Sequence, residues 1–181
     1  MATTSRLEFA LLGLLQQNAQ SGYDLRKTFA NTPMRHFSDS PGSIYPALRR
    51  LEERGWISAK AEDDSARKRQ VYRISAAGKR ALIDWLSQRV TREDIVHRQE
   101  ELMLRFAFLD GNVERDVTLR FVDQMVAALE EYVKELREYF KKFGPGVARD
   151  TGRLAFESGI QSYETSLSWA RGARKKLAKN L

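Results

Sequence analysis

The 181-residue sequence predicts a mainly α-helical protein with one small β-hairpin. Two short runs, Trp56–Lys60 and Gln70–Ile74, are rich in β-branched and aromatic residues, and the polar segment 61–69 separates them. Around this hairpin the apolar residues recur three and four positions apart, which is the period of an amphipathic helix. The second half of the chain shows no strand-like alternation. We therefore expect the hairpin to belong to an N-terminal unit and the remainder to be helical.

Three helices of the N-terminal unit have clear boundaries. Leucines at helical spacing predict a first helix over residues 6–17. Ser21, with an acidic residue three positions later, begins a second helix over residues 22–30. After the hairpin, Ser75 can cap a helix over residues 76–86, whose apolar positions are too crowded for a free surface helix. We expect its Trp85 to lie in a core or an interface.

The helix before the hairpin has an ambiguous start. Ser40 could cap a helix with Pro41 at its first position, or Ser43 could cap one that holds Pro46 in its first turn. In either case its residues separate into two faces. The apolar face comprises Ile44, Ala47, Leu48 and Leu51, and the other face comprises Gly42, Tyr45, Pro46, Arg49 and Arg50. One face can pack while the other docks on a partner.

Polar, aromatic and basic groups near the start of a helix suit the DNA major groove, because base edges offer donors and acceptors while the flanking phosphates attract guanidinium groups. The alternative is an ordinary amphipathic helix with a solvated charged face. The hairpin favours DNA, since its loop changes sign from Glu62-Asp63-Asp64 to Arg67-Lys68-Arg69. Three adjacent cations on a projecting hairpin can contact phosphates or the minor groove. Alternatively, these charges only prevent edge-to-edge strand pairing.

Charge is distributed unevenly along the chain. Residues 1–92 contain 16 Lys and Arg against 9 Asp and Glu, a net charge of +7, whereas residues 93–181 contain 15 of each and are neutral. A basic first half joined to a neutral second half indicates that one half binds a polyanion and the other has a different task.

Composition excludes several functional classes. The chain has no cysteine, so it has no disulfide, no thiolate nucleophile and no cysteine-based zinc site. His36 and His97 lie far apart in sequence, and no nucleophile and base set, phosphate loop or metal-ligand spacing is recognisable. We expect neither catalysis nor a cofactor or metal. The chain also shows no signal peptide and no apolar run of about 18 residues, which predicts a cytoplasmic protein without a membrane segment.

The second half begins near Thr91, where Thr91 to Asp94 resembles a capping box. We therefore predict a winged helix-turn-helix DNA-binding domain over residues 1–90 and a helical domain over residues 91–181. A long helix at about 113–143 and a final helix at about 149–179 both carry apolar residues three and four positions apart. The residues predicted to mediate dimerisation are Met125, Leu129, Tyr132, Leu136, Tyr139, Phe156, Ile160, Tyr163 and Leu167. The alternative is a hairpin within one chain.

The chain resembles the PadR family of bacterial transcriptional regulators. The residues that carry the resemblance are Leu7, Ala10-Leu-Leu-Gly-Leu-Leu15, Ser21-Gly-Tyr-Asp-Leu25, Gly42-Ser-Ile-Tyr-Pro-Ala-Leu48, Leu51-Glu-Glu-Arg-Gly-Trp-Ile57, Val71-Tyr-Arg-Ile-Ser75 and Ala77-Gly78. The helical half is similar to that of larger family members, which dimerise through several C-terminal helices. Two departures are Ser75, where threonine is usual, and the absence of glycine or proline before the basic residues of the wing.

The resemblance implies a repressor that is released by a small molecule, often an aromatic one. It also implies that Ser43, Tyr45 and Arg49 contact DNA, with further contacts from cations among Arg67, Lys68 and Arg69. The aromatic candidates for an effector pocket are Phe106, Phe108, Tyr163 and Trp169. Aromatic residues at such positions more often pack in a core or interface.

We therefore expect a sequence-specific DNA-binding regulator, a homodimeric repressor that binds a palindromic site in double-stranded DNA. The predicted DNA-binding residues are Ser43, Tyr45, Pro46, Arg49, Arg50, Arg67, Lys68 and Arg69. Two alternatives remain open: a winged-helix module that binds protein, and a nonspecific nucleoid-type DNA binder.

Overall fold

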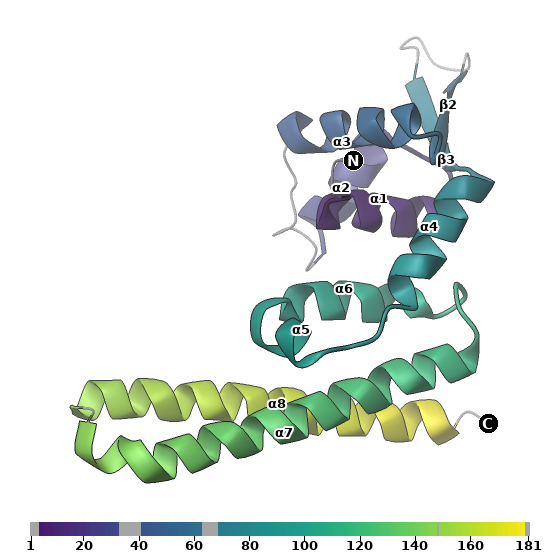
Figure 1. Ribbon diagram of the computed structural model, residues 1–181. Helices are drawn as coiled ribbons and strands as arrows, with labels where there is room; N and C mark the ends of the chain where they lie inside the picture. Colours follow the sequence, from purple (N-terminus) through teal and green to yellow (C-terminus); the bar gives the residue numbers. More distant parts are fainter. Residues whose placement is uncertain (1–3, 33–40, 63–68, 148, 180–181) are drawn as a thin grey trace. The chain divides into compact units, whose positions relative to one another are not determined.

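The computed structural model describes residues 4–32, 41–62, 69–147 and 149–179, and the chain divides into two compact units, Met1–Leu86 and Ser87–Leu181 (Figure 1). The prediction of a mainly α-helical fold with a small β-sheet is confirmed. The first unit contains, in order, α1 (Arg6–Gln17), β1 (Gln20–Ser21), α2 (Gly22–Ala30), α3 (Pro41–Glu53), β2 (Ile57–Glu62), β3 (Arg69–Ile74) and α4 (Ala76–Leu86).

Helix α1 lies at the centre of the first unit, where it contacts α3, α4 and β3. Ser5 caps it, and the side chain of Glu8 returns a hydrogen bond to the Ser5 backbone. Leu11 and Leu12 are completely buried. At the far end of the unit's core, the ring of Phe9 stacks on Trp85 at a centroid distance of 4.5 Å. The prediction that Trp85 is buried is confirmed.

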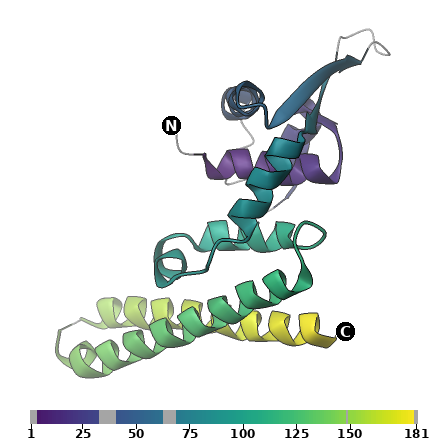
Figure 2. The same cartoon turned by 45° about the vertical axis from the view of Figure 1, so that its right-hand side comes forward.

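The sheet has the strand order β1-β3-β2, and both pairings are antiparallel. Strands β2 and β3 form the predicted hairpin, which projects from the helices of its unit in both views (Figure 2). Their register pairs Ile57 with Ile74 and Glu62 with Arg69. The two-residue strand β1 was not predicted, because so short a segment has no periodicity of its own.

Helix α3 begins at Pro41, so the earlier of its two predicted starts is correct. Pro46 therefore lies inside the helix and cannot donate a backbone hydrogen bond there. The helix ends at a Schellman motif, in which Trp56 N–H donates to the Leu51 carbonyl and Gly55 N–H donates to that of Glu52. Gly55 has a φ of 67°, a backbone conformation that favours glycine. This motif turns the chain directly from α3 into β2.

Over its described residues, the second unit contains helices and the short segments that connect them, and no strand. It contains α5 (Arg92–His97), α6 (Gln99–Leu109), α7 (Arg115–Val147) and α8 (Asp150–Lys179). Thr91 caps α5 as predicted, through a reciprocal capping box. Helices α7 and α8 pack side by side along their lengths (Figures 1 and 2). At 33 residues, α7 is about 50 Å long.

One boundary in this unit differs from the prediction. We expected the long helix to end at about residue 143, before Gly144-Pro145-Gly146, but α7 continues to Val147. A proline removes only the hydrogen bond that its own nitrogen would donate, and in the last turn few further bonds depend on it. None of the helices that the structure describes combines the length and apolar character needed to cross a membrane.

Candidate DNA-binding interface

Helix α3 presents one buried and one exposed face, as its sequence predicts. Ile44, Ala47, Leu48 and Leu51 have no exposed surface at all, which confirms the predicted packing face. On the opposite face, the exposed residues are Gly42, Tyr45, Pro46, Arg49 and Arg50. Ser43 is half-buried at the edge of this arc. The α3 residues predicted to bind DNA therefore lie together, and the aromatic ring of Tyr45 is 44% exposed among them.

The ring of Tyr45 lies over the first residue of α2. A Cβ atom added to Gly22 would lie 2.6 Å from Cε1 of Tyr45 and 3.2 Å from its Cζ, so only glycine leaves room for this ring. Nearby, Tyr72 is buried, and this burial raises the pKa of its phenol, with a further contribution from the negative charge of Glu52. The Tyr72 hydroxyl, which stays protonated at neutral pH, donates to Oε1 of Gln70 at 3.1 Å.

Replacing Gly22 by alanine should weaken DNA binding more than it affects folding. Alanine suits the helical first position of α2, so the free energy of unfolding should change by less than about 1 kcal/mol. The new Cβ would displace the Tyr45 ring, which can swing away because it is an exposed side chain. Thermal melting and DNA affinity would be measured together. Unchanged affinity would show that the position of this ring does not matter for binding.

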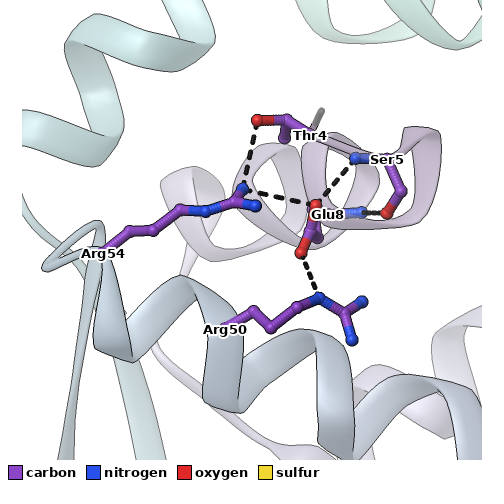
Figure 3. A network of polar contacts seen from close by, with 5 residues as sticks. All are labelled: Thr4, Ser5, Glu8, Arg50 and Arg54. Atoms are coloured by element: carbon purple, nitrogen blue, oxygen red, sulfur yellow. Dashed lines mark hydrogen bonds and ion pairs between the residues drawn. The ribbon is translucent and has the colours of Figure 1, made fainter. Parts of the chain in front are cut away.

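A cluster of ion pairs around Glu8 joins α1 to α3 (Figure 3). Glu8 is only 1% exposed. Its Oε1 accepts a hydrogen bond from Nε of Arg50 at 2.7 Å, and its Oε2 accepts from the Ser5 backbone nitrogen at 2.7 Å and from Nη1 of Arg54 at 3.4 Å. Arg54 also donates to Oγ1 of Thr4 at 3.1 Å. We name Thr4, Ser5, Glu8, Arg50 and Arg54 the Glu8 cluster.

The environment of Glu8 lowers its pKa from the ordinary value of 4.5. Burial by itself raises this pKa, but the hydrogen bonds from Ser5 and Arg50 and the charge of Arg54 together outweigh it. Because the folded state holds the proton less tightly than the unfolded chain does, the cluster stabilises the fold above about pH 4.5. This stabilisation is lost as the pH falls through the lower folded-state pKa.

The described part of the wing is also tied to the helices. Nη2 of Arg69, at the start of β3, lies 2.5 Å from Oδ2 of Asp24 and 3.0 Å from Oγ of Ser21. Burial raises the pKa of Asp24, but hydrogen bonds from Ser21 and the charge of Arg69 outweigh this effect and lower it. Arg69 thus braces the hairpin against the start of α2. The other two predicted wing residues, Arg67 and Lys68, lie outside the described residues.

Sequence reasoning missed three residues that support this surface: Glu8, Gly22 and Asp24 as a partner of Arg69. Glu8 carried a usable signal, because it follows Ser5 at capping-box spacing and shares a helical stripe with Leu11 and Leu15. A carboxylate on an apolar stripe must be paired when it is buried. Gly22 and the Asp24 pairing carried no such local signal, since both depend on residues more than 20 positions away.

Comparison with known proteins agrees with this arrangement. Residues 11–84, from α1 to α4, match the transcriptional regulator PadR-like family. This match covers most of the first unit and none of the second. The negative transcriptional regulator PadR of Bacillus subtilis (strain 168) is 28% identical over 120 residues, which are 66% of this chain and 65% of that protein. The match thus spans slightly less than two thirds of that relative.

Two solved structures are similar along most of this chain. Bacillus subtilis PadR in complex with operator DNA is 22% identical, with a TM-score of 0.46, and the match covers 94% of this chain and 98% of that one. The same protein in complex with p-coumaric acid is 23% identical, with a TM-score of 0.44, and the match covers 96% and 99%. The family that matches residues 11–84 consists of transcriptional regulators.

In the second unit, the predicted dimerisation residues pack largely between α7 and α8 of one chain. Met125, Leu129, Ile160 and Leu167 are buried, while Tyr132, Leu136, Phe156 and Tyr163 are half-buried. The rings of Tyr132 and Tyr163 meet edge to face at 4.8 Å, and those of Tyr139 and Phe156 stack at 5.8 Å. The seam therefore joins two helices of the same chain. Its part in dimerisation stays a prediction.

Two of the four predicted effector residues line one pocket. Phe106 and Trp169 meet edge to face at 5.1 Å and, with Lys176 among others, border a pocket of about 480 Å³. Phe108 is buried and Tyr163 packs against Tyr132, so neither of them lines this pocket. The structure thus brings together an aromatic pair and one cation within the second unit.

Proposed function

We propose that this PadR-like regulator is a sequence-specific repressor in which α3 enters the major groove of DNA. The observation that carries the proposal is the exposed arc of α3, where Tyr45 and Arg49 stand beside each other on a helix that is otherwise anchored by completely buried residues. A guanidinium can donate two hydrogen bonds to a guanine edge, and an exposed aromatic ring can contact a thymine methyl group. Arg67 and Lys68, which come directly before β3 in the sequence, would add phosphate contacts.

Selection of bound fragments from genomic DNA tests this proposal. We expect a small set of fragments that share a short palindrome and bind about 10³-fold or more tightly than random DNA at the same salt concentration. Equal affinity for selected and random fragments would favour a nucleoid-type binder. Absence of salt-dependent DNA binding would favour a winged helix that binds protein.

We also propose that the regulator acts as a homodimer through its helical unit. A dimer of helix-turn-helix units binds two half-sites about 34–36 Å apart. Because the two units are related by twofold symmetry, the DNA site that they bind is expected to be a palindrome. Tyr139 and Leu154 are each 56% exposed, although Tyr139 also stacks on Phe156 of the seam. Sedimentation should therefore give twice the chain mass of 20.8 kDa. A monomer at micromolar concentration would contradict this assembly.

The pocket bordered by Phe106 and Trp169 supports the proposal that a small aromatic effector binds this protein. Its aromatic walls suit a planar ring, and Lys176 suits a carboxylate on that ring. With p-coumaric acid as the probe, we expect saturable quenching of tryptophan fluorescence and release of the selected DNA.

Replacing Lys176 by glutamine should weaken binding of this probe about two- to fivefold, the effect of losing one partly exposed ion pair. Lys179→Gln provides a matched control, because Lys179 lies in the same last turn of α8 but does not border the pocket. Equal affinities of the two variants for the probe would show that Lys176 does not contact it. Absence of any saturable response in the wild-type protein would count against this probe as an effector.

A further inference from the structure

The two arginines of the Glu8 cluster are used differently. Arg54 contacts Glu8 through a terminal nitrogen, donates to Thr4 through the same nitrogen, and places its guanidinium 5.4 Å from the ring centroid of Trp56. Arg50 contacts Glu8 through Nε alone, and its two terminal nitrogens point away from Glu8 (Figure 3). The exposed fractions agree with this difference, at 45% for the Arg50 side chain and 24% for Arg54. Arg54 therefore faces inward and Arg50 outward.

A single bond at Nε has a consequence for the whole guanidinium group. The group is planar and rigid, so fixing Nε against a carboxylate oxygen also fixes the direction of both terminal nitrogens. A buried ion pair adds little net stability compared with apolar packing of the same volume. Its directional hydrogen bonds, however, hold side chains in a defined orientation, which apolar packing does not do as strictly.

The outward group of Arg50 lies on the face proposed to meet DNA. Successive residues of an α-helix are about 100° apart, which places Arg50 at one edge of the exposed arc, beyond Pro46 and next to α1. In major-groove binding, the edges of the reading helix face the phosphates on either side of the groove. Arg50 is thus placed for a phosphate, whereas Arg49 lies nearer the middle of the arc and Tyr45 lies at its opposite edge.

We propose that Glu8 is a positioning residue for DNA binding, which holds Arg50 by its Nε so that the terminal nitrogens face a DNA phosphate. The proposal rests on the function proposed for α3. In this proposal the buried carboxylate of Glu8 favours DNA binding, although it has the same sign of charge as DNA. By charge alone, removal of a carboxylate should strengthen DNA binding. If Glu8 positions Arg50, however, removal of its carboxylate should weaken DNA binding. The two explanations therefore predict opposite changes in DNA affinity.

The first test compares Glu8→Gln with Glu53→Gln on a selected DNA fragment. Both variants lose one negative charge, but Glu53 is an exposed residue at the end of α3. We expect Glu8→Gln to bind DNA about tenfold more weakly, as after loss of one charge-assisted hydrogen bond. The slope of log affinity against log salt concentration should also become shallower by about 0.9, the value for one phosphate contact. Glu53→Gln should bind as tightly as the wild-type protein or slightly more tightly. Affinities would be measured at a temperature at which melting curves show every variant folded.

A second pair of variants keeps the test valid if Glu8→Gln does not fold. Arg50→Lys preserves the positive charge and the pair between Glu8 and Arg54, but lysine has no Nε–H donor on a rigid plane. We expect Arg50→Lys to lose most of the affinity that Arg50→Gln loses. The double variant Glu8→Gln/Arg50→Gln should bind no more weakly than Arg50→Gln alone.

Three results would overturn the proposal: wild-type affinity in Glu8→Gln, wild-type affinity in Arg50→Lys, or additive losses in the double variant. Each of these results can be interpreted only if the wild-type protein binds the selected DNA more tightly than random DNA. If the wild-type protein shows no such preference, the function proposed for α3 fails, which is a different and separately visible outcome.

Discussion

Replacing Arg49 by alanine should weaken binding to selected DNA by about 1–3 kcal/mol, and replacing Tyr45 by alanine should have an effect of similar size. Both side chains are exposed, and both extend from a helix whose other face is completely buried. Their removal therefore leaves the core of the unit intact, and the loss of affinity reports on contacts with DNA. Because these residues are proposed to read bases, discrimination between selected and random fragments should also decrease.

Arg80→Ala is the matched control for Arg49→Ala. Arg80 is an exposed arginine on α4 in the same unit, so its replacement changes the net charge equally without altering α3. It should produce only a small loss that is similar for all DNA fragments. Titrations at several salt concentrations separate this general effect from loss of a base contact. Retention of full affinity and discrimination by both α3 variants would remove α3 as the reading helix.

The elements of the first unit could be predicted closely because their signals are local. Capping residues such as Ser21 and Ser75 stand immediately before the helices that they cap, and the β-branched runs of the hairpin are bounded by charged residues. The face of α3 followed from periodicity alone, since Ile44, Leu48 and Leu51 recur at helical spacing. Such signals need no knowledge of the rest of the fold.

The roles of individual charges could not be predicted in the same way. Arg50 and Arg69 were both predicted to bind DNA, yet their carboxylate partners lie 42 and 45 positions away in sequence. Only the packing of α1 against α3, and of β3 against α2, brings these groups together. A charge count recognises the basic surface but does not distinguish a bracing arginine from one that faces outward.

The heptad pattern of the second unit illustrates a different limit. An apolar stripe on α7 satisfies the same spacing whether its partner is α8 of the same chain or a helix of a second chain. In the structure, ion pairs between Arg137 and Glu164 and between Arg171 and Glu130, each at 2.6 Å, flank the stripe within one chain. A surface for a second chain must therefore use side chains that this seam leaves exposed, such as Tyr139 and Leu154.

Replacing Gly78 by alanine should destabilise the first unit by about 3 kcal/mol, near the upper end of the usual cost of overpacking. A Cβ atom there would lie 2.1 Å from the carbonyl oxygen of Trp56 and 2.9 Å from Cγ1 of Ile74. The Trp56 carbonyl cannot rotate away, because it belongs to the backbone and accepts a hydrogen bond from the Ser75 nitrogen at 2.9 Å. Helix α4 would have to move from the junction between α3 and β2.

The expected decrease in the melting temperature of the first unit is about 12–24 °C, given 4–8 °C per kcal/mol for a domain of this size. Gly159→Ala provides the matched control, since a Cβ atom at that exposed position in α8 would meet nothing within 4 Å. Alanine there should stabilise the helix by about 0.5–1 kcal/mol. Because Gly78 lies against the junction between α3 and β2, an unchanged melting temperature in Gly78→Ala would mean that α4 does not approach Trp56 this closely. The packing of α4 against the junction between α3 and β2 would then be less tight than the hydrogen bond from Ser75 to Trp56 indicates.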